Sequence, residues 1–380
     1  MDADRGLSAD EADLVGLVRK WAGERAAPLV ESHEEKEQFP RTLFGELGDM
    51  GLAGIPYDER YGGGGQSFLA YVAVLEELAR VYVSLAIAMS VHHLCAFGIE
   101  HFGSEDLKQR YLPRLFSGEW VGAYALSEAS SGSDAASLKT RAERDGGAYR
   151  LTGSKRFISQ AGEAECYLVM ARTGGEGPAG ISAFVVEKGW DGFEFGKLEH
   201  KMGWQSSPMR ELLFDGCAVP PENLVGEEGI GFKVALAALD GGRLGIAACS
   251  TGLAQAALDA SIAFTKERKQ FGRPVVEFEA VQFMLADMAT QIEASRRLYR
   301  EAARARDAGE PFSLGASMSK VFASDTAMRV TTDAVQLHGG YGYMAEYTVE
   351  RYMREAKAMQ IVEGTNQIQR MIIGRKLAGA

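Results

Sequence analysis

The sequence predicts a mainly α-helical fold in which a small antiparallel β-domain separates an N-terminal helical domain from a C-terminal four-helix bundle. Apolar residues recur at helical spacing over 8–118 and again from about 227, whereas 121–220 contains short β-rich runs between Gly, Pro and Asp. A chain of 380 residues is also too long for one ordinary hydrophobic core. We therefore expect three domains, with boundaries at 1–120, 121–226 and 227–380.

The N-terminal region carries clear helix signals. Ser8 is followed three residues later by Glu11, which is the spacing of a capping box, and apolar residues then recur at helical spacing. The stretch "SFLAYVAVLEELARVYVSLAIAMSVHHL" (67–94) is apolar nearly all the way round. Such a pattern predicts a buried helix. We expect His92 and His93 within it to be packed or pocket-lining residues and not metal ligands.

The middle region contains several short strand patterns separated by turn residues. These are "VGAYALS" (121–127), "CYLVMART" (166–173), "ISAFVVEK" (181–188) and "MRELLFDGCAV" (209–219). The run "ERDGGAYRL" (143–151) contains the Asp-Gly signal of a tight hairpin. This spacing predicts a small antiparallel sandwich or barrel.

The C-terminal region contains four long helix patterns joined by short links. They cover 231–271, 277–309, 311–340 and 365–377, and the third ends at Gly339 and Gly340 as helices commonly do. Long antiparallel helices with short connections predict a four-helix bundle.

Composition excludes several classes of function. Lys and Arg total 41 against 52 Asp and Glu, a net charge of −11, and no run of five basic residues occurs. This argues against a nucleic-acid partner and against binding to an anionic membrane surface. The apolar runs are interrupted too often to predict a membrane span. Four cysteines without a CxxC pair and six histidines without ligand spacing predict no metal site and a reducing, cytoplasmic location.

Four stretches combine glycine, hydroxyl, aromatic or basic residues in ways that a plain core does not need. Each alone has an ordinary explanation as a loop, a strand or a helix end. The segment "YALSEASSGSD" (124–134) could present amides and hydroxyls to a planar ring, and Phe157 in "KRFIS" (155–159) could stack on that ring. The segment "ERKQFG" (267–272) suits a pyrophosphate, and the glycines of "QLHGGYGY" (336–343) let a ligand approach the backbone.

A fifth stretch, "IVEGTNQIQR" (361–370), places Glu363 directly before Gly364 near the start of a helix pattern. One interpretation is a helix cap. The other is a carboxylate that a flexible backbone presents to a ligand.

Taken in order, these stretches resemble the acyl-CoA dehydrogenase family over essentially the whole chain. "ALSEASSGSD" (125–134) and "QLHGGYGYMAEYTVERYMREAK" (336–357) are similar to the two signature segments of that family. "ERKQFGRPVVEFEAVQFMLADMA" (267–289) and the 361–370 stretch are also close to family form. The resemblance implies the same order of domains, FAD as cofactor and the α,β-dehydrogenation of an acyl-CoA thioester to trans-2-enoyl-CoA.

The resemblance also implies a role for individual positions. Residues expected to hold the flavin ring are Tyr124, Leu126, Ser127, Phe157 and Ser159. Residues expected to reach the FAD of a neighbouring subunit are Arg268, Gln270 and Phe271, with Gln336 and Gly340 at its adenosine diphosphate part; Thr365 and Gln367 complete the cofactor site. Residues expected near the acyl-CoA are Ser133, Asp240, Arg243 and Gly364. Glu363 is expected to take the α-proton while the β-hydrogen leaves as hydride to flavin N5.

Two positions bear on this assignment. Some members of the family carry the base immediately before the arginine that corresponds to Arg243, and Gly242 at that place cannot serve as a base. Val362 stands where many straight-chain members have a tyrosine, so a branched acyl group is one hypothesis.

The resemblance further implies a homotetramer, built as a dimer of dimers, and an electron-transferring flavoprotein as partner. Alternatives on the same scaffold are an acyl-CoA oxidase and a dehydrogenase of acyl-carrier-protein thioesters. A remote alternative is a helical scaffold without catalytic activity. The length of the acyl chain and the metabolic direction are left open.

Overall fold

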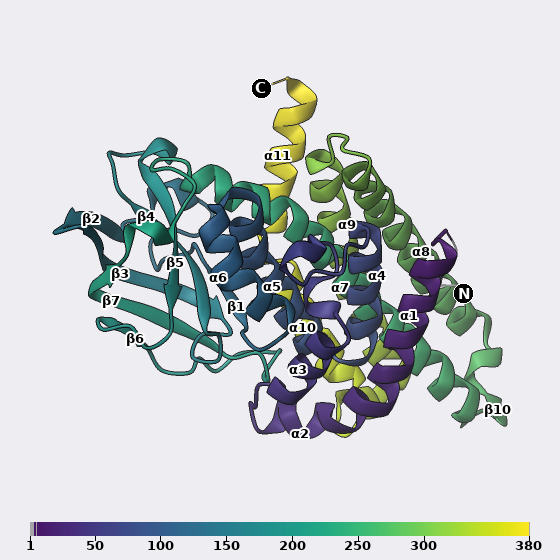
Figure 1. Cartoon of the computed structure of the whole chain (residues 1–380). Coiled ribbons are helices and arrows are strands. Elements are labelled where there is room, and N and C mark those ends of the chain that lie inside the picture. The colour runs from purple at the N-terminus through teal and green to yellow at the C-terminus, as the bar shows by residue number, and fades with distance from the viewer. Residues whose placement is uncertain (1–3, 5, 380) are drawn as a thin grey trace.

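The structure, a computed structural model, describes residues 4 and 6–379. Its elements follow the predicted order of helical, β-rich and helical segments, which confirms the fold class (Figure 1). The β-rich segment lies on one side of the molecule, and the helices of the two other segments pack together on the other side.

The first segment contains the helices α1 (Ala9–Trp21), α2 (Val30–Glu35), α3 (Arg41–Asp49), α4 (Phe68–Val81), α5 (Val83–Phe102) and α6 (Glu105–Phe116). The predicted capping box is confirmed, because Ser8 Oγ accepts from the Glu11 N–H and the Glu11 carboxylate accepts from the Ser8 N–H. The long apolar helix is interrupted at Tyr82, whose φ of −143° and ψ of 91° are extended. The buried Tyr82 hydroxyl donates to Ser206 Oγ at 2.8 Å, a tertiary contact that periodicity cannot reveal.

The middle segment forms one sheet from β1 (Gly122–Ala125), β2 (Arg141–Asp145), β3 (Ala148–Ser159), β4 (Cys166–Arg172), β5 (Ile181–Glu187), β6 (Phe193–Phe195), β7 (Met209–Val219) and β8 (Leu224–Val225). Its strand order is β6-β7-β3-β2-β4-β5-β8, with β1 also paired to β4. The predicted hairpin joins β2 to β3 through Gly146 and Gly147, whose φ values of 57° and 91° require glycine-like freedom.

The sequence analysis expected a purely antiparallel sheet, and this expectation is wrong. β1 runs parallel to β4, and β2 meets β4 in parallel at Arg141 and Arg172. A parallel pair needs a long crossover connection. The β2–β3 hairpin supplies that connection between β1 and β4, and short strand patterns alone do not reveal it.

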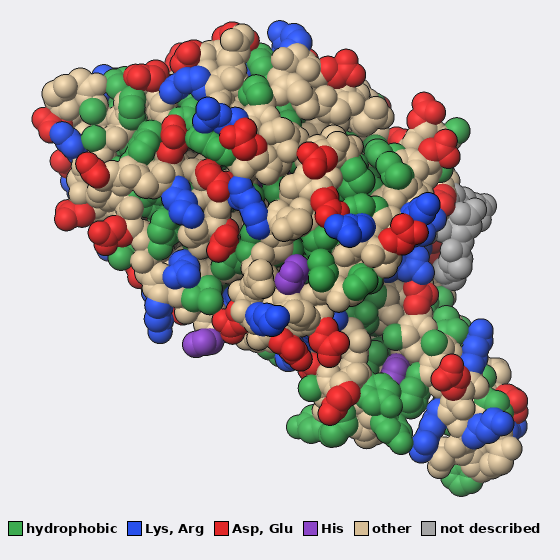
Figure 2. Space-filling model, turned by 60° about the horizontal axis from the view of Figure 1, so that its bottom comes forward, with side chains coloured by type: hydrophobic (Ala, Val, Ile, Leu, Met, Phe, Trp, Pro, Cys, Tyr) green, Lys and Arg blue, Asp and Glu red, His purple; other side chains and the backbone are tan. Residues whose placement is uncertain are grey.

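The last segment contains α7 (Gly231–Glu267), α8 (Glu279–Asp307), α9 (Ser313–His338), α10 (Val349–Met359) and α11 (Asn366–Ala378). All four predicted helices are present, and α10 is an addition that packs on both α7 and α9. Between α7 and α8, the short strands β9 (Lys269–Gln270) and β10 (Arg273–Pro274) form a hairpin that stands away from the body (Figures 1 and 2).

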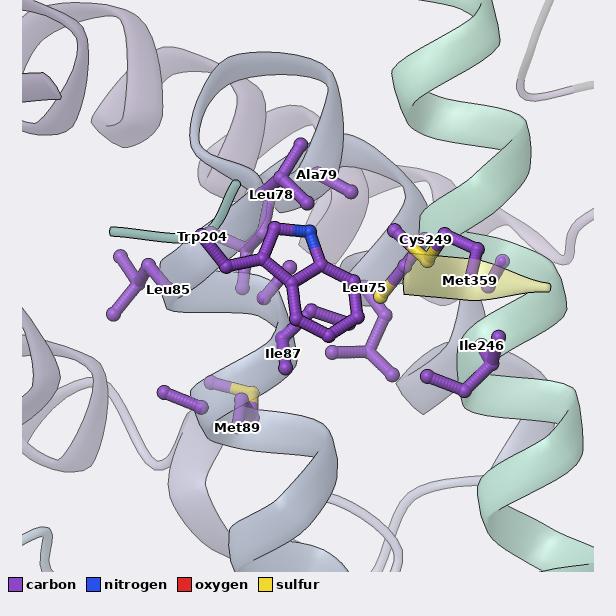
Figure 3. Close-up of a cluster of buried hydrophobic side chains, with 14 of the residues drawn as sticks. Leu75, Leu78, Ala79, Leu85, Ile87, Met89, Trp204, Ile246, Cys249 and Met359 are labelled. Carbon is purple, nitrogen blue, oxygen red and sulfur yellow. The ribbon is translucent and has the colours of Figure 1, made fainter. Parts of the chain in front are cut away.

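The three segments share a core around Trp204, which comes from the loop before β7 and is 3% exposed. Figure 3 shows its indole among Leu75 and Leu78 of α4, Ile87 of α5 and Ile246 of α7. Because a large aromatic side chain contributes strongly to core packing, this insertion fixes the β-rich segment against the helices that carry the candidate site.

Two of the helices are more continuously apolar than the sequence analysis expected. α5 and the 37-residue α7 are long and apolar enough to cross a bilayer by length and composition. In the fold, 83% and 78% of their most apolar windows are buried inside the protein. Their composition is therefore that of central core helices, which must be apolar on nearly every face.

Candidate active site

The turn between α10 and α11 carries Glu363 in an unusual backbone conformation. Glu363 has a φ of 55° and Gly364 a φ of 93°, so two consecutive residues are left-handed. This conformation costs a non-glycine residue about 1–2 kcal/mol. Thr365 is the N-cap of α11, with its Oγ1 accepting from the Ile368 N–H at 3.3 Å. The helix-cap interpretation therefore applies to Thr365 and not to Glu363.

The Glu363 carboxylate points into the protein without a partner. The residue as a whole is half-buried, but both carboxylate oxygens are shielded from solvent and make no hydrogen bond to any described residue. Burial raises the pKa of Glu363 to about 8, although the charges of Arg243 and Lys320 oppose the rise. A buried, unpaired carboxylate with a raised pKa is a typical general base.

Gly242 of α7 lies directly opposite this carboxylate. A Cβ added to Gly242 would stand 2.1 Å from Glu363 Oε2 and 2.7 Å from Leu94 Cδ2. The space next to the alternative base position is thus already filled by the Glu363 carboxylate. The two possible base positions face the same point in space, and only one of them holds an acid.

Other predicted residues gather around this point. Arg243 is 5% exposed and donates from Nη1 to Asp240 Oδ1 at 2.5 Å, while its Nε has no partner among the described residues. Ser313 Oγ donates to the same Asp240 oxygen at 3.0 Å. The Tyr124 hydroxyl donates to the Ala235 carbonyl at 3.2 Å, and burial, together with Glu363, raises the pKa of Tyr124.

The turn also depends on buried side chains that the sequence analysis did not single out. Lys320 of α9 donates from Nζ to the Gly364 carbonyl at 3.0 Å and to Asn366 Oδ1 at 2.9 Å. Gln369 Nε2 lies 3.1 Å from the Glu363 carbonyl and 3.2 Å from the Gly364 carbonyl, donating to both. Both are polar residues on helices, and nothing in their spacing separates them from solvent-facing residues.

The two segments predicted to hold a flavin ring are brought together in the β-rich domain. The Arg156 N–H donates to the Ser127 carbonyl at 2.8 Å. Lys155, which the sequence analysis did not single out, is buried and donates to the Leu126 carbonyl at 3.2 Å and to Glu128 at 2.7 Å.

The side chains predicted to contact the ring or the substrate differ in exposure. Phe157 is 59% exposed with a φ of 60°, so its ring faces solvent and is not packed in the core. Ser159 is half-buried on the same strand, and Ser133 is exposed in the loop after β1.

Five of the remaining predicted cofactor residues line a separate cavity of about 790 Å³. Its walls include Arg268, Gln270, Phe271, Gln336 and Gly340. Figure 2 shows hydrophobic side chains beside the projecting hairpin. Arg268 follows the end of α7, roughly 39 Å from Gly242 along that helix at its usual rise per residue. Thr365 and Gln367, by contrast, lie on the turn and first residues of α11.

These residues fit a flavin dinucleotide. Phe157 offers an exposed aromatic face beside backbone and hydroxyl groups, which suits a planar heterocycle. The large cavity offers an arginine and exposed glycine backbone; a Cβ added at Gly339 or Gly340 would meet nothing within 4 Å. Within the described residues, no group of three His, Cys, Asp or Glu side chains could hold a metal ion.

A second, very small cavity lies beyond Gly242, with a volume of about 10 Å³. Its walls include Phe68, Tyr71, Leu94, Phe97 and Arg306. The Arg306 guanidinium lies 3.5 Å from the centre of the Phe68 ring. Such a space is close to the minimum for one water molecule.

Val362 does not belong to this cavity. Its side chain packs against the main hydrophobic core. The hypothesis that Val362 opens space for a branched acyl group therefore receives no support from its position.

Comparison with known protein families gives three matches in order along the chain. The N-terminal domain of acyl-CoA dehydrogenase matches residues 8–119, the middle domain 123–217 and the C-terminal domain 229–378. The chain is 45% identical to the mitochondrial isobutyryl-CoA dehydrogenase of Dictyostelium discoideum, over 98% of this chain and 90% of that protein. It is 44% identical to the short-chain specific acyl-CoA dehydrogenase of Megasphaera elsdenii, over 98% and 99% of the two chains.

Solved structures share the fold at similar identity. Butyryl-CoA dehydrogenase from Megasphaera elsdenii superposes with a TM-score of 0.96 at 43% identity, over 99% of this chain and 100% of that one. A chain solved in work on the electron transferring flavoprotein of Acidaminococcus fermentans gives 0.97 at 47%, over 98% and 99%. A glutaryl-CoA dehydrogenase from Mycobacterium smegmatis in complex with FADH2 gives 0.94 at 30%, over 100% and 97%.

Proposed function

The chain belongs to the acyl-CoA dehydrogenase family, and we propose that it converts a short-chain acyl-CoA thioester to its trans-2-enoyl product with Glu363 as base. One observation carries this proposal. The Glu363 carboxylate is buried, has no hydrogen-bond partner among the described residues and faces a glycine. A carboxylate left in this state is poised to accept a proton from a bound substrate.

The α-proton of a thioester becomes acidic when its carbonyl accepts hydrogen bonds that strengthen as enolate charge develops. The backbone N–H of Glu363 donates to no group among the described residues and is available for this task. Glu363 then takes the α-proton onto its carboxylate while the α,β double bond forms. Bound FAD supplies the acceptor for the β-hydrogen, which leaves as hydride. Burial of the Glu363 oxygens excludes water from the point where charge develops.

The small cavity beyond Gly242 supports a short acyl chain. Because its volume is close to the minimum for one water, each added methylene must displace Phe68, Leu94 or their neighbours. Forcing extra methylenes into a packed site costs about 1–3 kcal/mol, or roughly 5- to 150-fold in rate. The short-chain and isobutyryl-specific relatives agree with this size.

We expect butyryl-CoA and isobutyryl-CoA to bleach the flavin at least about tenfold faster than octanoyl-CoA. Stopped-flow absorbance under anaerobic conditions measures these rates. Leu94→Ala removes a cavity wall, so this variant should raise the rate for longer chains relative to butyryl-CoA. Equal wild-type rates for butyryl-CoA and octanoyl-CoA would contradict the short-chain proposal, and a carrier-protein thioester preferred over CoA would point to the biosynthetic alternative.

We propose an electron-transferring flavoprotein as the partner that receives the electrons. A chain from work on such a flavoprotein is 47% identical to this one, which supports the choice. An oxidase on the same scaffold would instead form one hydrogen peroxide for each enoyl product in air.

The split of the cofactor residues supports an oligomer in which FAD binds between two chains. Arg268 and Gly242 stand roughly 39 Å apart along α7, so one chain presents the two parts of its cofactor site far from each other. Phe271, which is 93% exposed on the projecting hairpin, is suited to reach a neighbouring copy. A dimer of dimers would place each hairpin against the FAD held by another chain.

Mixed oligomers test this arrangement. Arg268→Ala and Glu363→Gln are each expected to be inactive alone, because each removes one part of every site. Co-expression should restore about a quarter of wild-type activity, since half of the random pairs contain one intact site. The readout is anaerobic bleaching by butyryl-CoA of the unselected co-expressed protein, because selection for mixed pairs would raise the expected fraction. If both residues serve the same chain's FAD, no mixed oligomer contains an intact site and no activity returns.

A further inference from the structure

Lys320 is a buried cation that the proposed reaction does not use. It lies on α9 and is 0% exposed, and its Nζ contacts the Gly364 carbonyl at 3.0 Å and Asn366 Oδ1 at 2.9 Å. Burying a lysine is costly unless its charge is compensated. Its hydrogen bonds go to neutral groups of the turn that carries Glu363, so the compensation must come through space.

The turn needs outside donors because its backbone is not helical. Glu363 and Gly364 are both left-handed, and their carbonyls accept from side chains instead of from a helix ladder. Two side chains supply the donors: the neutral amide of Gln369 and the ammonium of Lys320. Both side chains donate hydrogen bonds to the turn, but only Lys320 also brings a charge. Comparing variants of the two residues therefore distinguishes the effect of the charge from the effect of the hydrogen bonds.

The charge of Lys320 influences the Glu363 carboxylate, although the ammonium makes no hydrogen bond to either carboxylate oxygen. Neither Glu363 oxygen has a hydrogen-bond partner among the described residues, and the Lys320 ammonium donates to the Gly364 carbonyl and to Asn366 instead. Burial lowers the pKa of Lys320 to about 8, and the charge of Glu363 is the largest influence that opposes this. The other titratable or charged groups that face this pair from packed elements are Arg243 and Cys249 of α7, Tyr71 of α4, Tyr124 of β1, Asp325 of α9 and Arg370 of α11.

We propose that Lys320 is the positioning residue of the base: it fixes the Glu363–Gly364 turn through the Gly364 carbonyl and its charge favours the carboxylate form of Glu363 while leaving both oxygens free for substrate. This rests on the proposed function, which assigns the role of base to Glu363. A direct ion pair would also stabilise the carboxylate, but it would occupy the oxygen that must accept the proton. Because the Lys320 ammonium is hydrogen-bonded to the Gly364 carbonyl, both Glu363 oxygens stay free to accept the proton.

The first test compares Lys320→Gln with Gln369→Leu. Loss of the Lys320 charge should move the acid limb of the pH profile of flavin reduction upward by about one unit, because the carboxylate form becomes harder to reach. Gln369→Leu removes two hydrogen bonds from the same turn without changing its charge, so it should lower the rate and leave the limb in place. An unshifted limb in Lys320→Gln would overturn the proposal, provided that the variant binds FAD as wild type does.

A second test does not depend on catalysis or on the folding of a Lys320 variant. Coupling between two titrating groups is reciprocal, so Glu363→Gln should lower the pKa of Lys320. The measurement is a pH titration by NMR of holoenzyme labelled with ¹³C at lysine Cε. Lys155 is an internal control, because burial also lowers its pKa to about 8 but its partner is Glu128. Its signal should not move, and an unmoved Lys320 signal would refute the coupling.

The two failures can be told apart. If wild-type protein fails to reduce its flavin with any acyl-CoA, the proposed function is wrong, and the NMR titration still decides whether Lys320 and Glu363 are coupled. If wild type reduces flavin but either Lys320→Gln or Glu363→Gln fails to produce its shift, the function stands and the role given to Lys320 is wrong.

Discussion

Glu363→Gln is expected to leave FAD bound and to abolish the bleaching of that flavin by saturated acyl-CoA. Glutamine keeps the size and shape of the side chain but cannot take the α-proton. A positioned general base contributes about 10²–10⁴-fold to the rate, and here the alternative base position, 242, holds a glycine that cannot take over. The loss should therefore lie at or beyond the upper end of that range.

The wild-type reaction should depend on pH in a defined direction. Only the carboxylate form of Glu363 can accept a proton. Because burial raises the pKa of Glu363 to about 8, kcat/KM for the free enzyme should rise with pH through that value and level off above it. A profile that is flat between pH 6 and 9 would mean that Glu363 is not the group that titrates.

Glu355→Gln provides a matched control for this experiment. Glu355 of α10 is also buried, and burial together with Glu34 raises its pKa to about 8. Its neighbours are Glu34 and Arg351, and it takes no part in the cavity beside Gly242. Loss of bleaching in Glu363→Gln with retention in Glu355→Gln would identify a specific base. Wild-type bleaching in Glu363→Gln would show that the base assignment is wrong.

The sequence allowed the order of domains to be predicted because helical and strand periodicities are local properties. The capping box at Ser8 and the Gly146–Gly147 hairpin were predictable for the same reason, since each is decided within a few residues. The break at Tyr82 and the parallel pairing of β1 with β4 were not predictable, because each depends on a partner far along the chain.

The candidate site divides in the same way. The resemblance supplied Glu363 and the flavin segments as expectations, and the fold brings Tyr124, Asp240 and Arg243 together near that glutamate. Lys320 could not be recognised, since a lysine on an amphipathic helix is ordinarily solvent-exposed and only tertiary packing buries this one. The hypothesis for Val362 stays a prediction: its side chain packs against the main core, and adjacency to the base in sequence does not place it in the small cavity beside Gly242.

Gly242→Ala is expected to reduce flavin bleaching by about 100-fold, because a misplacement of about 1 Å in a reacting group can cost that much. The new Cβ would stand 2.1 Å from Glu363 Oε2, so the carboxylate must leave its position. The measurement is the anaerobic bleaching rate with butyryl-CoA, together with the FAD content. Gly374→Ala on α11 is a control for the same change in a helix, because its Cβ meets nothing within 4 Å.

A double variant decides whether the clash acts on the carboxylate or on the helix. Aspartate at position 363 is one methylene shorter, so its carboxylate retreats from the added Cβ. The variant Gly242→Ala with Glu363→Asp should therefore lose little more activity than Glu363→Asp alone, which is a strongly non-additive result. Additive losses would instead show that the alanine disturbs the packing of α7 against Leu94, the other atom group within 3 Å of that Cβ. In that case the glycine at position 242 would be needed for the close packing of α5 on α7. It would not be needed to leave room for the Glu363 carboxylate.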